Sequence, residues 1–298
     1  MDLNDLRAEL DAYANDPRLT VPDNLYARAE ALDFLHFVRE MARIEQDKTP
    51  EGAQLQQDAQ RLAKKLTALN NQLFQAARTA IRQGTLTGIA LRHYCDRFTA
   101  YRPGLGDWVY TSYDGLDVLF DGIFQLKQAP TPTLLPTAEM VRCEETPARV
   151  LLAMVDQVAL GADDLFYDLG SGLGQVVMAV HLLTGVAAKG VEIEPAFCTF
   201  AQRQAQALGL TGVTFLNQDA RQVDYQDGTV FFLFTPFRGQ LLQTVLARLQ
   251  KVAQQHVIRL CTFGPCTPHV AAQPWLHPIT PAARHEYKLV IFESHVGE

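Results

Sequence analysis

The feature that most constrains this chain is a glycine-rich turn between a short apolar stretch and a helix-forming segment. Residues Asp168 to Gln175 read DLGSGLGQ. This segment begins at the end of the apolar stretch LFYDL, residues 165–169, and is followed by VVMAVHLL. Glycines at such a turn allow tight backbone conformations and the close approach of a ligand to the main chain. In an open α/β sheet this turn lies at the carboxyl end of a strand, where nucleotide-type ligands bind. The pattern predicts a cofactor site, although a plain strand-to-helix turn can carry the same glycines.

The spacing of the glycines narrows the class of cofactor. Dinucleotide-binding turns follow G-x-G-x-x-G and place a pyrophosphate at the helix start. Here the spacing is G-x-G-x-G, and Asp168 stands two residues before Gly170. A carboxylate in that place repels a pyrophosphate and suits a cationic amino-acid group. A nicotinamide-dependent oxidoreductase is therefore disfavoured.

A second carboxylate supports the cofactor site. Glu192 ends the next apolar stretch in GVEIEP, 24 residues after Asp168, close to the spacing of about 20 residues at which an acid binds a ribose. Glu194 is the alternative, because strand alternation places it on the same side as Glu192. Asp219 and Ala220 follow the third apolar stretch, where an adenine amine could be met, although an aspartate after a strand is often a turn former.

From Thr146 onward, apolar strands alternate with helical segments. Thr146-Pro147 is typical of a helix start, with Thr146 as the N-cap. Strands are expected at 165–169, 187–193, 213–217, 229–234 and 256–263, with helices between them, and a final hairpin at 275–294. This alternation predicts an α/β fold, a Rossmann-like seven-stranded, mostly parallel sheet with an antiparallel C-terminal hairpin.

The first third of the chain has a different pattern. Apolar residues recur at helical spacing on both sides of a Pro-Gly turn at 47–52, which predicts an all-helical domain over 1–100 containing an antiparallel helix pair. Residues 101–140 are predicted to be an irregular linker or lid, and their proline-rich end APTPTLLPT looks like a linker or a strap over the neighbouring domain. Trp108, Tyr110 and Tyr113 could form a lid or one wall of a substrate site, or could pack the linker against the neighbouring domain. The cofactor-binding domain is expected over 141–298.

Composition excludes several classes of protein. Hydrophobic residues make up 48% and the net charge is −7, so a full core can form, while non-specific binding to nucleic acid is disfavoured. No apolar run reaches the roughly 18 residues that span a bilayer, and the acidic N-terminus lacks the features of a secretory signal. Five scattered cysteines without ligand spacing indicate reduced thiols and no metal site. We therefore expect a cytoplasmic protein without a membrane partner.

Taken together, these motifs resemble those of class I S-adenosylmethionine-dependent methyltransferases. DLGSGLG resembles the first motif of that family, GVEIEP the second and NQDA the adenine-side motif. Within the family, DLGSGLGQVV followed by GVE is most similar to the Dot-type, non-SET histone-lysine methyltransferases. Glu145-Thr146 is similar to the Dot-type loop that closes over the methionine end of the cofactor, with Cys143 where that family has a tyrosine.

The resemblance implies S-adenosyl-L-methionine as cofactor and a role for each matched residue. Asp168 would meet the amino group of the methionine moiety, Glu192 the ribose and Asp219 the adenine amine. The full set of cofactor-binding residues that it implies is Glu145, Thr146, Asp168, Gly170, Ser171, Gly172, Gly174, Gln175, Glu192, Asp219 and Ala220.

The acceptor site is expected after the fourth strand, at Thr235, Pro236 and Phe237. The resemblance implies that this segment, in place of the family's asparagine-rich strand end, would hold a nitrogen acceptor, a protein lysine or another amine or amide. Thr235 could instead cap a turn, and Phe237 could be core. The altered motif leaves an alternative function open, a catalytically weak or inactive cofactor-binding module whose helical domain binds a partner protein.

Overall fold

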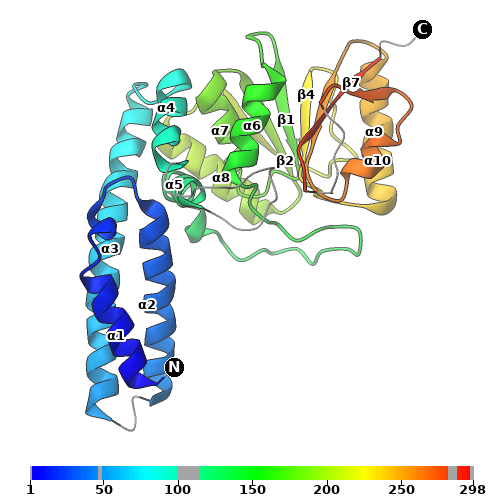
Figure 1. The fold of residues 1–298 in the computed structure, drawn as a ribbon. Coiled ribbons are helices and arrows are strands. Elements are labelled where there is room, and N and C mark those ends of the chain that lie inside the picture. The colour runs from blue at the N-terminus through cyan, green and yellow to red at the C-terminus, as the bar shows by residue number, and fades with distance from the viewer. Residues whose placement is uncertain (1, 46–48, 100–113, 281–286, 296–298) are drawn as a thin grey trace.

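The computed structural model describes residues 2–45, 49–99, 114–280 and 287–295. At its centre is a seven-stranded sheet in the order β3-β2-β1-β4-β5-β7-β6 (Figure 1). The first five strands run parallel, and β7 is antiparallel to both β5 and β6. The strands are β1 Leu165–Leu169, β2 Ala187–Glu192, β3 Val213–Asn217, β4 Val230–Leu233, β5 Arg259–Thr262, β6 Leu276–Pro278 and β7 Val290–Ser294. The predicted fold class is confirmed.

Helices cover both faces of the sheet because alternate strand residues point to opposite sides. Phe166 packs in the hydrophobic cluster formed with α6, α7 and α8, whereas its neighbour Tyr167 packs in the cluster formed with α9. These helices are α6 Ala148–Val158, α7 Gln175–Thr184, α8 Pro195–Leu208, α9 Gly239–Ala253 and the short α10 Thr267–Ala271. The central strands β1, β4 and β5 are therefore buried on both sides, which explains their largely apolar sequences.

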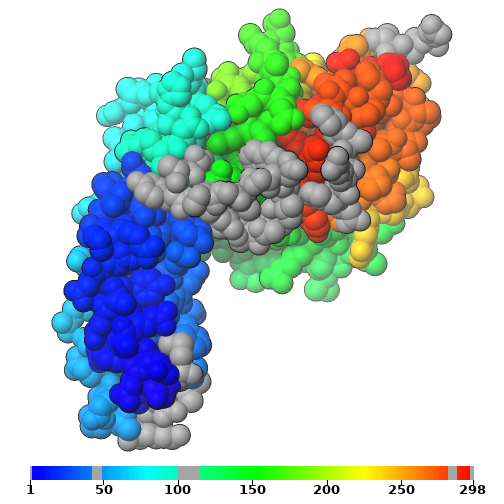
Figure 2. All heavy atoms as spheres, in the orientation of Figure 1, coloured from blue at the N-terminus to red at the C-terminus, as the bar shows by residue number. Residues whose placement is uncertain are grey.

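The N-terminal helices form an arm that projects from the sheet domain (Figures 1 and 2). Helices α2 and α3 lie side by side, as the predicted antiparallel pair, and α1 packs against both. The arm has its own hydrophobic cluster, and its elements are α1 Leu3–Ala14, a 3-10 turn at Pro17–Thr20, α2 Leu25–Glu45 and α3 Pro50–Arg82. Although α3 is long, no helix among the described residues is long and apolar enough to cross a membrane.

A buried arginine secures the end of the arm nearest the sheet. Arg28 is 1% exposed. Its Nε donates to Asn70 Oδ1 on α3 at 2.5 Å, and its terminal nitrogens donate to the backbone carbonyls of Val21 and Pro22 at 2.5 and 2.6 Å. Burial lowers the pKa of the guanidinium. The side chain thus joins α2, α3 and the loop before α2 through one polar network inside an apolar core.

Removing this side chain should destabilise the arm. In Arg28→Ala, the Asn70 amide and two carbonyls lose their donor inside the core, and each unsatisfied buried group costs about 1–3 kcal/mol. We expect the free energy of unfolding of the arm to fall by about 2–4 kcal/mol, measured by urea denaturation followed by circular dichroism. Arg39→Ala, an exposed position on the same helix, is the control. Equal midpoints for the two variants would contradict this account.

One helix lies in the segment that the sequence predicted to be irregular. Residues Gly115–Phe124 form α5, so the prediction for 101–140 was wrong in this part. The physical signals are an N-terminal capping box between Asp114 and Asp117 and apolar residues at helical spacing. The two glycines of GLDVLFDGIF disfavour a helix, so the sequence pattern did not predict one here. A 3-10 turn at Leu126–Gln128 follows α5.

The packing places α4 and α5 with the sheet. Helix α4, Gly88–Thr99, and helix α5 share one hydrophobic cluster with α6 and α7, separate from the cluster inside the arm. The same cluster also includes Ala77 and Ile81 at the end of α3, and the division at residues 100 and 140 stays a prediction. Trp108, Tyr110 and Tyr113 lie outside the described residues.

Candidate functional site

The glycine turn is shaped by what packs against it. Gly170 has φ +81°, and a Cβ on it would lie 2.2 Å from the Cβ of Pro236, which follows β4. Gly172 has φ +51°, and a Cβ there would lie 2.6 Å from the Sγ of Cys143. The first glycine therefore lets the ends of β1 and β4 approach, and the second lets the segment before α6 cross the turn.

Asp168, at the end of β1, is a buried carboxyl group without a cationic partner. It is 4% exposed, and no Lys or Arg of the described chain pairs with it. Burial, together with the charge of Glu192, raises its pKa to about 8. A carboxyl group in this state is destabilised until a cation is placed against it.

Glu192, at the end of β2, is held by the backbone on both of its oxygens. Its Oε2 accepts the N–H of Gly172 at 2.8 Å, and its Oε1 accepts the N–H of Glu194 at 2.8 Å. Burial raises its pKa, and these hydrogen bonds oppose the increase. The carboxylate is thereby fixed beside the glycine turn, with further lone pairs on each oxygen.

Glu194, the alternative acid, has a different function. It is the N-cap of α8, accepting the N–H of Ala196 at 3.0 Å. Its carboxylate also accepts the backbone N–H groups of Thr133 and Leu134 at 2.8 and 2.7 Å and the Thr133 hydroxyl at 2.7 Å. Both carboxylate oxygens of Glu194 therefore bind the segment that precedes α6. We call this segment, residues 129–147, the strap.

A cavity of about 1000 Å³ opens at the carboxyl ends of the strands. The strap forms one wall, and the glycine turn and the segment after β4 form the others. Figure 1 shows the strap as a long loop along this edge of the domain. The cavity is lined by every proposed site residue except Gly174, namely Glu145, Thr146, Asp168, Gly170, Ser171, Gly172, Gln175, Glu192, Asp219, Ala220, Thr235, Pro236 and Phe237.

Two buried polar atoms at this cavity lack a partner among the described residues. They are Ser171 Oγ in the glycine turn and Gln175 Oε1 at the start of α7. Both residues line the cavity and are under 10% exposed. A buried polar atom without a hydrogen bond is costly, so a polar ligand that pairs with them fits this site, as does a cation against Asp168.

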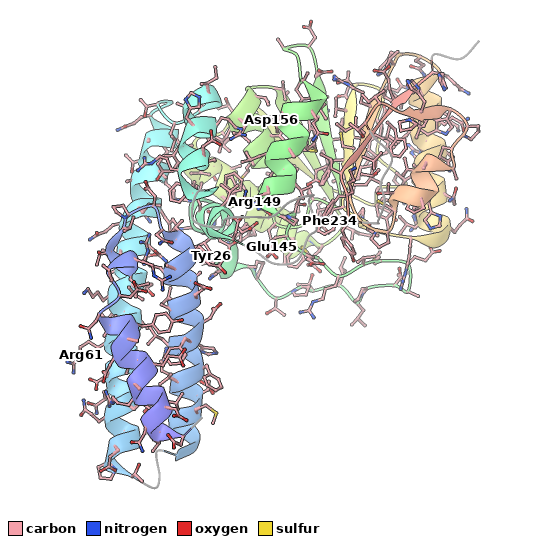
Figure 3. The ribbon with its side chains drawn as sticks, viewed as in Figure 1. Tyr26, Arg61, Glu145, Arg149, Asp156 and Phe234 are labelled. Atoms are coloured by element: carbon pink, nitrogen blue, oxygen red, sulfur yellow. The ribbon has the colours of Figure 1, made fainter. Side chains whose placement is uncertain are left out.

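The helix after the strap begins differently from the prediction. Helix α6 starts at Ala148 with Pro147 as its N-cap, so Thr146 is not the capping residue. Instead, Asp117 of α5 accepts the N–H of Ala148 at 2.7 Å. Asp114 of α5 is also ion-paired with Arg149, labelled in Figure 3 near Glu145. A cap supplied by a distant helix frees Thr146 to face the cavity.

Asp219 forms a local turn and also lines the cavity. Its carboxylate accepts the Nε and Nη2 of Arg221, at 3.0 and 2.6 Å, and the Arg221 N–H at 2.9 Å, which makes a local turn. The hydrogen bonds from Arg221 lower its pKa. The residue lines the cavity beside Ala220, so an ionised carboxylate is present on that wall.

The segment after β4 is fixed by the hydroxyl of Thr235. This residue has φ +41°, which is uncommon for a β-branched residue. Its Oγ1 donates to the Phe263 carbonyl at 3.2 Å and accepts the Cys266 N–H at 3.1 Å. The hydroxyl therefore joins the ends of β4 and β5, consistent with the structural alternative weighed for it.

The aromatic side chain of Phe237 is 5% exposed and belongs to the core cluster on the α9 side. Phe234, labelled in Figure 3, is half-buried and lines the cavity. Its ring centroid lies 5.1 Å from that of Phe263, which lies 5.9 Å from the ring of Tyr287. The sequence analysis missed Phe234, because a residue at the end of an apolar strand has the same signature whether it faces core or cavity.

Comparisons with known proteins point to one enzyme class. Residues 138–231 match the family model described as "Histone methylation protein DOT1". This chain is a Rossmann-like S-adenosylmethionine-dependent methyltransferase, and its residues 138–231 are similar to the Dot-type family. The match begins within the strap and includes the glycine turn, Glu192 and Asp219, so the enzyme class predicted from these motifs is confirmed. As a methyltransferase it has a methyl-acceptor substrate.

Several solved structures that are similar to part of this chain are described as methyltransferases. One is an RNA methyltransferase from Salinibacter ruber in complex with S-adenosyl-L-homocysteine, at 21% identity and a TM-score of 0.41, covering 52% of this chain and 95% of that one. Another, a methyltransferase from Thiobacillus denitrificans with the same ligand, has 24% identity, a TM-score of 0.34 and coverages of 42% and 51%. The putative methyltransferase yhhF from Escherichia coli has 16% identity, a TM-score of 0.42 and coverages of 49% and 86%. No curated protein matches the chain.

Proposed function

We propose that this methyltransferase transfers its methyl group to a nitrogen acceptor, a protein lysine or another amine or amide. The observation that supports this most is the character of the cavity wall. Acidic residues predominate among its ionisable side chains, and Phe234 and Tyr287 supply aromatic surface. An acidic and aromatic wall attracts a cationic amine and disfavours phosphates and carboxylates.

The cofactor-binding residues have roles that follow from their positions. The Asp168 carboxylate would pair with the ammonium group of the methionine moiety, and Glu192 would accept hydrogen bonds from the ribose hydroxyls. Asp219 and Ala220 would meet the adenine, and Glu145 and Thr146 would close the methionine end from the strap. Ser171 and Gln175 offer buried polar atoms without partners among the described residues, and Gly170, Gly172 and Gly174 shape the turn.

When bound, S-adenosylmethionine supplies an electrophilic methyl group on a sulfonium. The protein then has to align a nitrogen lone pair with that methyl and exclude water. The acceptor nitrogen would lose a proton to solvent before the transfer, because an ammonium group has no free lone pair. The nitrogen–methyl bond would form as the carbon–sulfur bond breaks, and the electrons of that bond would stay on sulfur. Pro236, packed on Gly170, and the ring of Phe234 would form the apolar side of this path, with Thr235 and Phe237 behind them.

Incubation with methyl-labelled S-adenosylmethionine and fractionated cell lysate tests the proposal. Label in protein, in acid-stable form on lysine, or in a small amine is the expected result. Label found only in RNA or on a carboxylate would overturn the nitrogen acceptor and leave the enzyme class intact. No label in any fraction, together with retained cofactor binding, would favour the non-catalytic cofactor-binding module.

Removing the Thr235 hydroxyl should separate turnover from cofactor binding. In Thr235→Ala, the end of β4 loses its link to the end of β5, so the acceptor path shifts while Asp168 and Glu192 stay in place. We expect turnover to fall about tenfold or more, since small misplacements are costly in group transfer, with the cofactor Kd nearly unchanged. Thr235→Ser retains the hydroxyl and should recover much of the activity. Product quantified by mass spectrometry at saturating cofactor checks both; equal turnover in wild type and Thr235→Ala would remove the hydroxyl from this role.

A further inference from the structure

The middle of the strap is attached to the acceptor side of the cavity. Glu139 reaches the first turn of α9, where its Oε1 accepts the N–H of Gln240 at 2.6 Å and its Oε2 accepts the N–H of Leu241 at 3.2 Å. Helix α9 has no capping side chain of its own at this end. The strap therefore supplies the cap of the helix that follows the acceptor segment.

Main-chain hydrogen bonds on both sides of Met140 also join the strap to the segment after β4. The Arg238 N–H donates to the Glu139 carbonyl at 2.9 Å, and the Val141 N–H donates to the Pro236 carbonyl at 3.1 Å. Met140 and Phe237 form an isolated antiparallel bridge between these bonds. Residues 139–141 and 236–238 thus behave as a short two-stranded pair.

The cofactor side of the cavity is held by the same strap. Glu194, two residues after Glu192, binds Thr133 and Leu134, and residues 143–146 line the cavity beside the glycine turn. One continuous segment therefore contacts the proposed cofactor site at both of its ends and the acceptor segment between them. A ligand that orders this segment can order the attached segments as well, to the extent that these hydrogen bonds form together.

We propose that Glu139 is a positioning residue that couples cofactor binding to the order of the acceptor segment, residues 235–238. The inference rests on the proposed placement of the cofactor. Glu139 touches neither cofactor nor acceptor in this scheme and acts through the α9 cap and the 139–141 pairing. The acceptor segment is thereby more ordered when the cofactor is bound, and this favours binding of the cofactor first.

Hydrogen–deuterium exchange on the full chain, with and without saturating S-adenosylhomocysteine, tests the coupling without a known acceptor. In wild type, the ligand should slow exchange in peptides covering 168–176 and also, by roughly threefold or more, in peptides covering 235–242. In Glu139→Ala the slowing at 168–176 should persist and that at 235–242 should disappear. Glu139→Gln keeps an acceptor oxygen for the Gln240 N–H and should restore part of the slowing.

The comparison variant is Glu194→Ala, which releases the opposite end of the strap. Its affinity for S-adenosylhomocysteine, measured by calorimetry, should fall several-fold. Without ligand, the hydrogen–deuterium exchange of residues 239–242 should keep the wild-type rate. If Glu139 were only structural, Glu139→Ala would speed exchange at 235–242 by the same factor with and without ligand, and this would overturn the proposal. Ligand binding to wild type with no slowing at 235–242 would do so as well. Absence of any binding to wild type would instead overturn the proposed cofactor site.

Discussion

Glu192→Ala should weaken binding of S-adenosylmethionine by at least about tenfold. Hydrogen bonds to a charged group contribute about 1.5–3 kcal/mol, and 1.4 kcal/mol corresponds to a factor of ten in affinity. The structure adds a second reason, because Glu192 also accepts the N–H groups of Gly172 and Glu194 at 2.8 Å each. The variant would lose both the proposed ribose contact and the acceptor that fixes the glycine turn.

Isothermal titration calorimetry with S-adenosylhomocysteine measures this effect. Asp163→Ala, which removes an exposed carboxylate just before β1, is the matched control and should bind as wild type does. Glu192→Gln should be intermediate, since its amide keeps one acceptor oxygen but turns N–H groups toward a backbone donor. Unchanged affinity in Glu192→Ala, with an unchanged melting temperature, would show that the ribose is held elsewhere.

Asp168→Asn should abolish most of the cofactor affinity and change its pH dependence. The carboxyl group has a pKa of about 8 in the ligand-free protein because it is buried beside Glu192. Pairing with the cofactor's ammonium group stabilises the ionised form, so binding below pH 8 releases a proton. Wild-type affinity should therefore rise between pH 6 and pH 8 and level off above, with a loss of about tenfold or more in the variant.

Calorimetry in two buffers of different ionisation enthalpy measures the proton release directly. Wild type should release a fraction of a proton at pH 7, and Asp168→Asn should release less. Both proteins showing the same proton release would exclude Asp168 as the group that titrates.

The same substitution should stabilise the ligand-free protein at high pH. The folded-state pKa of about 8 lies above the ordinary value of 3.8, so the folded protein binds a proton that the unfolded chain has released. Stability contributed by this group is therefore lost as pH rises from about 4 to 8. The melting temperature of Asp168→Asn relative to wild type should increase with pH over this range; a difference independent of pH would contradict the assignment.

The sheet was predictable because its signals are local. Each strand is a short apolar stretch, and the glycine turn and helix starts separate them, so a parallel sheet with a final antiparallel hairpin was the consistent solution. Helix α5 was missed because Gly115 and Gly122 obscured its periodicity. The cap of α6 was assigned to Thr146 because a capping side chain usually comes from a residue next to the helix start. The carboxylate that accepts the Ala148 N–H belongs instead to Asp117, 31 residues away.

The candidate site was predictable on its cofactor side for the same reason. Asp168, Gly170 and Glu192 each follow a strand, and parallel strands bring their carboxyl ends to one edge. The choice between Glu192 and Glu194 needed the structure, because both carboxylates lie at that edge. Only the packing shows that Glu194 binds the strap at Thr133 and Leu134.

The sequence alone therefore determined the enzyme class and the edge of the sheet where the cofactor site lies, since both follow from residues that are near one another in the chain. The tertiary structure decided what surrounds that edge. Phe234, rather than Phe237, supplies the half-buried ring at the cavity, and Glu139 joins the strap to α9 across about 100 residues of chain. Such contacts depend on how separate segments pack, and no local pattern of residue types encodes which of two neighbouring side chains turns inward.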